Sequence, residues 1–252
     1  MLTRVFLGSL LLTACSFHVG PLGTSTQGEH GTAQFAYDAC LFGCKIDSAM
    51  MVGTSEIIRV TAIAIPPVEV RSSDDGAFSV SAATRHCCTA NAGACHDLPA
   101  NEACAVDETT SSLSISVVAN GAGNAELVLD AGQKAGVFDS IALDVAEPAS
   151  LAVSCGTGVG DVSLASTSSC SLGWTARAAN GDVLMASTGV TMTTSDPKVA
   201  DFRATILSAN ESSITALQGM LGSTLDAHSA GETTIQANAG GASSKLAVHV
   251  TP

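Results

Sequence analysis

The alternation of apolar and polar residues over short segments most constrains how this chain can fold. In the clearest case Leu113, Ile115 and Val117 alternate with serines, so an extended strand would place all three apolar side chains on one face. The same pattern recurs at 58–61, 141–145 and 245–250, and turn-forming residues stand at 73–76, 120–121, 180–182 and 195–197. Since no long segment has a helical period, the sequence predicts an all-β chain of half-buried antiparallel strands packed as sandwiches.

The composition agrees with a packed β structure and argues against nucleic acid as a partner. Apolar residues make up 46% of the 252 residues and aromatic residues 4%. This is too apolar for a disordered chain and suits short strands with small side chains. The formal net charge is −13 at pH 7. Because an acidic surface repels phosphate backbones and anionic lipid headgroups, we expect no nucleic-acid partner.

Residues 1–14 have the organisation of an export signal. Arg4 precedes an apolar run over 5–12, and small residues then precede Cys15. The run is shorter than the roughly 20 residues that a membrane-spanning helix needs. We therefore expect a signal peptide over 1–14. The alternative is an ordinary secretory signal followed by an incidental cysteine.

The segment Leu12-Thr13-Ala14-Cys15 resembles the lipobox of bacterial lipoproteins. The resemblance implies that Cys15 becomes the mature N-terminus and carries acyl chains such as palmitate, and more than one chain gives stable membrane anchoring. In such lipoproteins the next residue directs sorting, and Ser16 in this position implies the outer membrane. Residues 15–32 are rich in Gly, Ser and Thr. They are expected to form a flexible tether that begins at the lipidated Cys15.

The rest of the sequence contains one pattern twice. Each copy has a Ser-Asp turn, a strand, a strand that begins with glycine, and a terminal strand. The two turns lie at 72–76 and 194–197, and the two terminal strands at 141–145 and 246–250. Such a repeat indicates two domains of the same kind.

The second copy resembles a bacterial Ig-like domain of the second group, in the segments 176–184, 195–200, 231–235 and 248–252. The resemblance covers about 149–252 well and 33–147 loosely. It implies two tandem Ig-like antiparallel β-sandwich domains, a disulfide-rich one over 33–147 and a second over 148–252. Domains of this family serve as stalks and adhesion modules on bacterial surfaces, but their turn-and-strand motifs specify a fold better than a function.

Removing Cys15 from the nine cysteines leaves an even number, which suits disulfide bonds in an exported protein. Cys155 and Cys170 are expected to join adjacent strands near the start of the second domain, with Trp174 in its core. The polar stretch 85–104 is expected to form a disulfide-stapled surface loop. Cys87 and Cys88 are adjacent and should each have a separate partner, but the sequence leaves the pairing open. The six cysteines of the first domain are Cys40, Cys44, Cys87, Cys88, Cys95 and Cys104.

Two metal sites can be drawn from the same region, and we favour neither. The residues whose types suit zinc are His86, Cys87, Cys88, Cys95 and His96. In an oxidising compartment such thiols form disulfides instead. The oxygen ligands available for calcium are Asp74, Asp75, Asp97, Asp107 and Glu108, whose spacing matches no calcium loop. The sequence therefore predicts no metal and no cofactor, with calcium binding left open.

The sequence lacks the motifs of common catalytic sites, including the Gly-x-Ser-x-Gly elbow and His-Glu-x-x-His. Its histidines are scattered: His249 falls on the solvent face of the last strand, and His228 is expected to form a surface pair with Asp226. We therefore expect a non-catalytic surface, adhesion or structural module that contacts an unidentified envelope protein or glycan. A periplasmic accessory subunit of an envelope complex is the alternative, and a hydrolase with an unrecognised site is the least favoured hypothesis.

Overall fold

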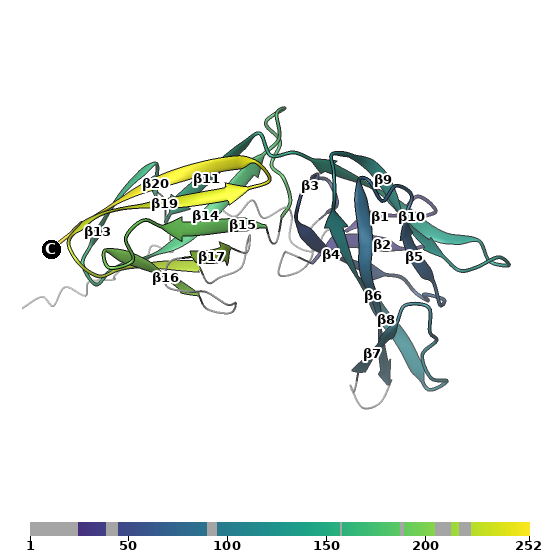
Figure 1. Ribbon diagram of the computed structural model, residues 1–252. Helices are drawn as coiled ribbons and strands as arrows, with labels where there is room; N and C mark the ends of the chain where they lie inside the picture. The colour runs from purple at the N-terminus through teal and green to yellow at the C-terminus, as the bar shows by residue number, and fades with distance from the viewer. Residues whose placement is uncertain are drawn as a thin grey trace, which may run out of the picture.

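The computed structural model describes residues 25–38, 45–89, 95–156, 158–186, 189–204, 213–216 and 223–252. Every regular element in these residues is a β-strand, and the strands form two sandwiches, one after the other along the chain (Figure 1). This confirms the prediction of an all-β chain with two sandwich domains. The expected signal peptide, Cys15, Cys40 and Cys44 lie outside the described residues. No helix that could cross a membrane occurs in the part of the chain that the structure describes.

The first sandwich packs a six-stranded sheet against a four-stranded sheet. The six strands, in spatial order, are β1 (Thr26–Gln27), β2 (Gln34–Tyr37), β4 (Ser55–Thr61), β8 (Glu108–Ala119), β6 (Phe78–Thr89) and β7 (Cys95–Pro99). The four are β3 (Met50–Met51), β10 (Val137–Ala146), β9 (Gly123–Asp130) and β5 (Glu69–Ser72). Leu113, Ile115 and Val117 of β8 are fully buried in the core that both sheets line, as the alternation predicts.

The second sandwich packs two five-stranded sheets around a separate core. One sheet has the order β12 (Gly158–Val159), β11 (Ser150–Cys155), β14 (Ser169–Arg177), β18 (Ser223–Ala227) and β16 (Ala200–Ala204). The other has the order β13 (Asp161–Ala165), β20 (Ala242–Thr251), β19 (Gly231–Ala239), β15 (Val190–Thr194) and β17 (Ser213–Ala216). Trp174 lies in this core, as expected. The described pairs are antiparallel except β3 with β10 and β13 with β20.

The first sandwich begins earlier than the sequence predicted, because residues 25–32 are held on it. β1 pairs with β2, and the buried carboxylate of Asp139 accepts hydrogen bonds from the backbone N–H groups of His30, Thr32 and Ala33, at 2.9, 2.9 and 2.7 Å. Burial alone would raise the pKa of Asp139, but these hydrogen bonds outweigh it and hold the pKa below its ordinary value. The ionised carboxylate therefore stabilises the folded form of this segment.

We expect Asp139→Asn to reduce stability at neutral pH by about 1–3 kcal/mol, the range for lost hydrogen bonds to a charged group. A carboxyl group whose pKa is lowered on folding contributes stability above its ordinary pKa, about 4, and this contribution is lost as the pH falls through its folded pKa. The difference in free energy of unfolding between the natural protein and the variant should therefore become smaller in acid. Urea unfolding at pH 7 and at pH 3 measures it, with Asp75→Asn in an exposed turn as the control. An equal difference at both pH values would contradict this role.

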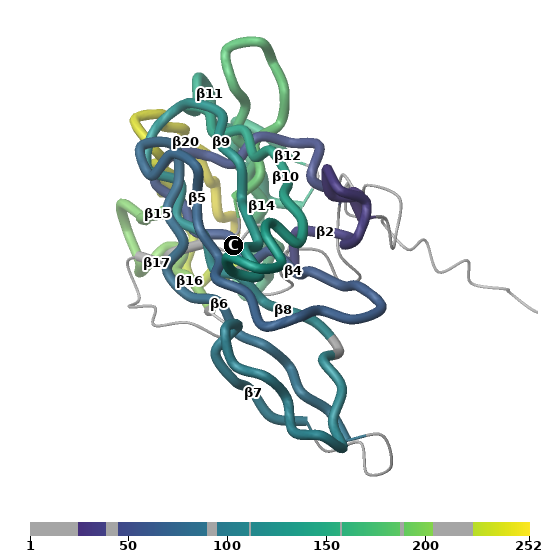
Figure 2. The backbone as a smooth tube through the Cα atoms, turned by 90° about the vertical axis from the view of Figure 1, so that its right-hand side faces the viewer, coloured from purple at the N-terminus to yellow at the C-terminus, as the bar shows by residue number. Residues whose placement is uncertain are grey.

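β6, β7 and β8 continue beyond the rest of the first sandwich as a projecting extension, here defined as residues 84–89 and 95–110 (Figures 1 and 2). The prediction of a surface loop over 85–104 is therefore wrong for residues 85–89 and 95–99, which are strands. β6 runs unbroken to Thr89, and β7 then pairs with it. The reason is local, because Cys88 and Cys95 stand directly opposite in the β6–β7 register and a disulfide joins them.

The two sandwiches meet at a joint, here defined as residues 49–51 and 184–186. Met50 and Met51 are neighbours on β3, yet the side chain of Met50 lies in the first core and that of Met51 in the second. The backbone N–H of Met51 donates to the carbonyl of Met185 at 2.9 Å, and the N–H of Met185 donates to the carbonyl of Ala49 at 2.8 Å. Met185 in turn packs against the first core. The domains thus share backbone hydrogen bonds as well as core side chains.

Candidate functional site

Two disulfides fix the extension on its two faces. Cys87 is bonded to Cys104, and Cys88 is bonded to Cys95, so the neighbouring cysteines have different partners. Successive side chains of a strand point to opposite faces, which places one disulfide on each side of β6. In the second sandwich a third disulfide, between Cys155 and Cys170, joins β11 to β14.

The face of the extension that carries His86 is here called the outer face, and the face that carries Cys87 the inner face. The outer face has a serine, a histidine and an aspartate from three adjacent strands. Asp97 stands directly opposite His86 in the β6–β7 register, and its Oδ1 lies 2.5 Å from His86 Nδ1. On the other side of the ring, His86 Nε2 lies 2.9 Å from Ser114 Oγ. This is the hydrogen-bond order in which an aspartate orients a histidine and the histidine takes a proton from a serine.

Acyl transfer at Ser114 would need more than this row of hydrogen bonds. Acyl transfer also needs donors, often backbone N–H groups, aimed at the negative oxygen of the tetrahedral intermediate. Ser114 lies on β8, which has β4 on one side and β6 on the other, with Arg59 and Thr84 opposite Ser114. The N–H groups of such an inner strand are used by the two ladders. The backbone N–H groups of β8 near Ser114 are therefore already paired and do not supply these donors.

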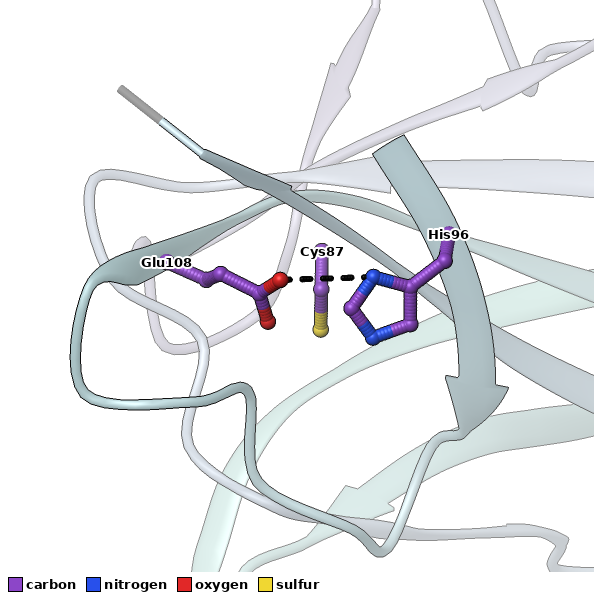
Figure 3. Close-up of side chains that lie close together, drawn as sticks. All are labelled: Cys87, His96 and Glu108. Atoms are coloured by element: carbon purple, nitrogen blue, oxygen red, sulfur yellow. Dashed lines mark ion pairs between the residues drawn. The ribbon is translucent and has the colours of Figure 1, made fainter. Parts of the chain in front are cut away.

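The inner face of the extension holds a denser cluster, formed by Cys87, His96 and Glu108 (Figure 3). In the described residues this is the one group of three such side chains whose potential ligand atoms all lie within 4.8 Å of one another. His96 Nδ1 lies 3.3 Å from Glu108 Oε1, and the sulfur of Cys87 lies between the two side chains. The Glu108 side chain is 10% exposed, whereas that of His96 is 50% exposed. Solvent therefore reaches the cluster from the side of the imidazole.

Arg85 lies at the base of the cluster and is 1% exposed. Its Nη1 donates to the carbonyl of Ile65 at 2.7 Å and to Thr110 Oγ1 at 2.5 Å. Its Nη2 donates to the carbonyls of Pro66 and, at 2.9 Å, Ala100. One guanidinium thus ties β6 to β8, to the segment before the extension at Ile65 and Pro66, and to Ala100 just after β7, and so fixes how the extension leaves the sandwich.

The other polar residues singled out in the sequence are dispersed. Asp97 and Glu108 pair with different histidines on opposite faces of the extension, and Asp74 caps its own turn through the N–H of Gly76 at 2.8 Å. The calcium candidates are therefore not brought together as one set.

His228 does form a surface pair, but its partner is not the one predicted. Its Nε2 lies 2.7 Å from Asp201 Oδ1, whereas Asp226 accepts a hydrogen bond from Arg203 at 3.0 Å. In the β16–β18 register Asp201 stands opposite Asp226, so His228 and Arg203 each lie two residues along the chain from this pair and reach Asp201 and Asp226 diagonally. On the last strand, His249 is exposed as expected and lies 3.2 Å from Glu232.

A cleft of about 810 Å³ lies where the two sandwiches meet. Its charged lining includes both signs: Lys45, Asp47, Asp144, Arg177 and Asp182. Arg177 donates to a backbone carbonyl of its own hairpin, and Asp144 accepts from Asn124. Because the charges are mixed and several are already paired, the cleft favours no particular ligand chemistry.

No protein-family model and no curated protein matches this chain. Similar solved structures include domains 5–6 of the S-layer protein SbsC, at 15% identity over 81% of this chain and 94% of that chain, with a TM-score of 0.29. The adhesin InvE of Yersinia pseudotuberculosis is similar at 15% identity over 89% and 62% of the two chains, with a TM-score of 0.33. The β-glucuronidase of Parabacteroides merdae is similar at 8% identity over 87% and 24%, with a TM-score of 0.31. Likenesses this low concern strand-rich architecture and carry no information on activity.

Sequence reasoning named all three members of the inner cluster, but in two separate metal hypotheses. The zinc hypothesis contained Cys87 and His96, and Glu108 stood among the calcium candidates. Arg85 and Ser114 were recognised only as members of a loop and a strand. Their roles depend on which strands are neighbours, and no local motif encodes that information.

Proposed function

We propose that the chain is a lipid-anchored envelope protein whose two sandwiches form a non-catalytic surface, adhesion or structural module. Support for the anchor comes from the charged and apolar start and from the lipobox-like segment that ends in Cys15. Ser16 supports sorting to the outer membrane. The partner is an envelope protein or a glycan, and the acidic net charge of −13 argues against nucleic acid.

The observation that carries the module proposal is the joint. Interfaces between domains of one chain commonly allow relative motion unless they are large and hydrophobic. Here the N–H of Met51 donates to the carbonyl of Met185 and the N–H of Met185 donates to the carbonyl of Ala49, while Met51 and Met185 each pack against the core of the other sandwich. Two sandwiches held in this way keep the extension at a fixed position relative to the rest of the protein. Such an arrangement suits a protein that presents a surface.

The extension is the contact surface that we assign to the partner. It projects from the sandwich, two disulfides keep its shape, and Val106 within it has a fully exposed apolar side chain. A single exposed valine is common on protein surfaces, so the projection and the two disulfides carry this assignment, and Val106 provides the position for a probe.

In-cell photo-cross-linking of the full chain tests the proposal. A photoreactive amino acid in place of Val106 should give a reproducible adduct with one envelope protein or glycan, identified by mass spectrometry. The matched control is Val159, an exposed valine on β12 of the second sandwich, which should give none. Adducts of equal yield at both positions, or none at Val106, would remove the extension as the contact surface. If added protease fails to cleave the chain on intact cells, the periplasmic accessory subunit becomes the better assignment.

Cys15→Ser should abolish membrane anchoring, because the hydroxyl group cannot accept the thioether-linked lipid. We expect the variant to take up no clickable fatty acid and to leave the membrane fraction on cell fractionation. Ser16→Asp is the matched variant: it should still be acylated but remain at the inner membrane. Continued acylation of Cys15→Ser would show that the lipid is attached elsewhere.

The hydrolase alternative has one observation in its favour, the row formed by Ser114, His86 and Asp97. We expect a fluorophosphonate probe to leave Ser114 unlabelled, because β4 and β6 take up the N–H groups of its strand. Mass spectrometry of the probe-treated protein measures this. Labelling at Ser114 that is lost in His86→Gln but kept in Ser116→Ala would instead identify a serine hydrolase.

A further inference from the structure

We infer that Cys87, Cys104, His96 and Glu108 form a binding site for one divalent zinc-like metal ion when the Cys87–Cys104 disulfide is reduced. The site lies on the inner face of the extension, where Figure 3 shows three of the four side chains. The inference does not depend on the proposed anchoring or on the partner.

Four potential donor atoms already converge at this place. A sulfur of Cys87, a nitrogen of His96 and an oxygen of Glu108 lie within 4.8 Å of one another, and the Cys104 sulfur is bonded to that of Cys87. In a tetrahedral zinc site with bonds of about 2.0–2.3 Å, neighbouring donors lie roughly 3.3–3.8 Å apart. The donors therefore need to move by about 1–2 Å. Cys104 lies between β7 and β8, outside both strands, so it can move without breaking a ladder.

The donor types specify the class of metal. Two thiolates, one imidazole and one carboxylate are the ligands of a borderline-soft ion that accepts tetrahedral geometry, which describes zinc better than calcium or magnesium. The burial of Glu108 also fits, because a buried carboxylate needs a compensating charge or hydrogen bonds. In the disulfide form the compensation comes from His96 and from the backbone N–H of Ala105, which donates to Glu108 Oε2 at 3.1 Å.

The disulfide and the metal exclude each other, because the thiolate and not the disulfide sulfur is the metal ligand. A dithiol reductant transfers two electrons and two protons to the Cys87–Cys104 bond, which breaks to give two thiols while the reductant becomes a disulfide. The metal ion then replaces the two thiol protons, which pass to solvent. Glu108 binds as a carboxylate and His96 as a neutral imidazole.

Cobalt(II) titration of the purified full chain tests the site, because tetrahedral thiolate coordination gives Co²⁺ intense visible and near-ultraviolet absorption. The chain is reduced with a phosphine. The phosphine becomes a phosphine oxide with an oxygen atom from water, so that no added thiol competes for the metal. We expect one Co²⁺ per reduced chain, its displacement by Zn²⁺, and no thiolate–Co²⁺ absorption from the oxidised chain. Circular dichroism on the same samples follows the fold. Absence of binding by the reduced chain, whether folded or unfolded, overturns the inference.

Substitutions identify the ligands. Cys104→Ser should remove the thiolate–Co²⁺ absorption of a two-thiolate site, and Glu108→Gln and His96→Ala should each weaken binding by at least about 10-fold, since loss of even an outer-shell partner commonly costs 10- to 100-fold. Glu108→Gln keeps the size of the side chain and so guards against misfolding as the explanation.

The matched control is His249→Ala, from a His–Glu pair without thiols, which should bind normally. Joint replacement of Cys88 and Cys95 should also leave binding intact. Binding that survives Cys104→Ser, or that is lost with Cys88 and Cys95, places the metal elsewhere and overturns the inference.

Discussion

Replacing Arg85 with alanine is expected to lower the free energy of unfolding of the first sandwich by about 3–5 kcal/mol, the cost of leaving buried polar partners unpaired. The guanidinium is almost fully buried and donates to the carbonyls of Ile65, Pro66 and Ala100 as well as to Thr110. Alanine supplies no donor and leaves a cavity. The carbonyl groups cannot turn to other partners without moving the segments that hold the extension.

Denaturant unfolding followed by tyrosine fluorescence measures this effect. Tyr37 is the only tyrosine in the sequence and is fully buried in the first core, so it reports on that sandwich. Arg59→Ala is the matched control, because Arg59 lies on the same sheet but is half exposed and pairs with Asp38 at the surface. Its loss should cost no more than about 1 kcal/mol. Similar midpoints for the two variants would show that the buried guanidinium contributes little.

Arg85 also explains why the extension could not be predicted as strands. Alternation identified β8 because Leu113, Ile115 and Val117 fill its inward positions. On β6 the corresponding inward positions near the tip are held by Arg85 and Cys87, both buried. An arginine at an inward position interrupts the apolar pattern, and a local pattern cannot show that carbonyls from distant segments will satisfy it. The stretch therefore looked like a polar loop.

The polar surfaces of the extension could not be predicted because they depend on strand pairing. Ser114 belongs to the row of serines that the alternation correctly placed on the less buried face, but its contact with His86 requires the register of β6 on β8. That register shifts between His86 and Cys87. A shift of one residue reverses the face to which a side chain points. Without the fold, sequence reasoning could therefore propose His96 or Glu108 as ligands but could not place them together.

Met51→Ala is expected to destabilise the second sandwich by about 2–5 kcal/mol, the usual cost of truncating a buried methionine. The residue belongs by sequence to the first sandwich, where β3 pairs with β10. Its side chain nevertheless lies fully buried in the second core, with Trp174 in the same cluster. The structure thus predicts that a change in one domain acts mainly on the other. Domains joined by a free linker would not show this behaviour.

The adjacent residue provides the matched control, because Met50→Ala makes the same change on the opposite side of β3, in the first core. Trp174 is the only tryptophan in the sequence, so its fluorescence follows the second sandwich while Tyr37 follows the first. Met51→Ala should move the Trp174 transition to lower denaturant concentration, and Met50→Ala should move the Tyr37 transition. A Trp174 transition that does not move in Met51→Ala would mean that the joint does not form in solution. The proposed module would then lose the feature that fixes the position of its extension.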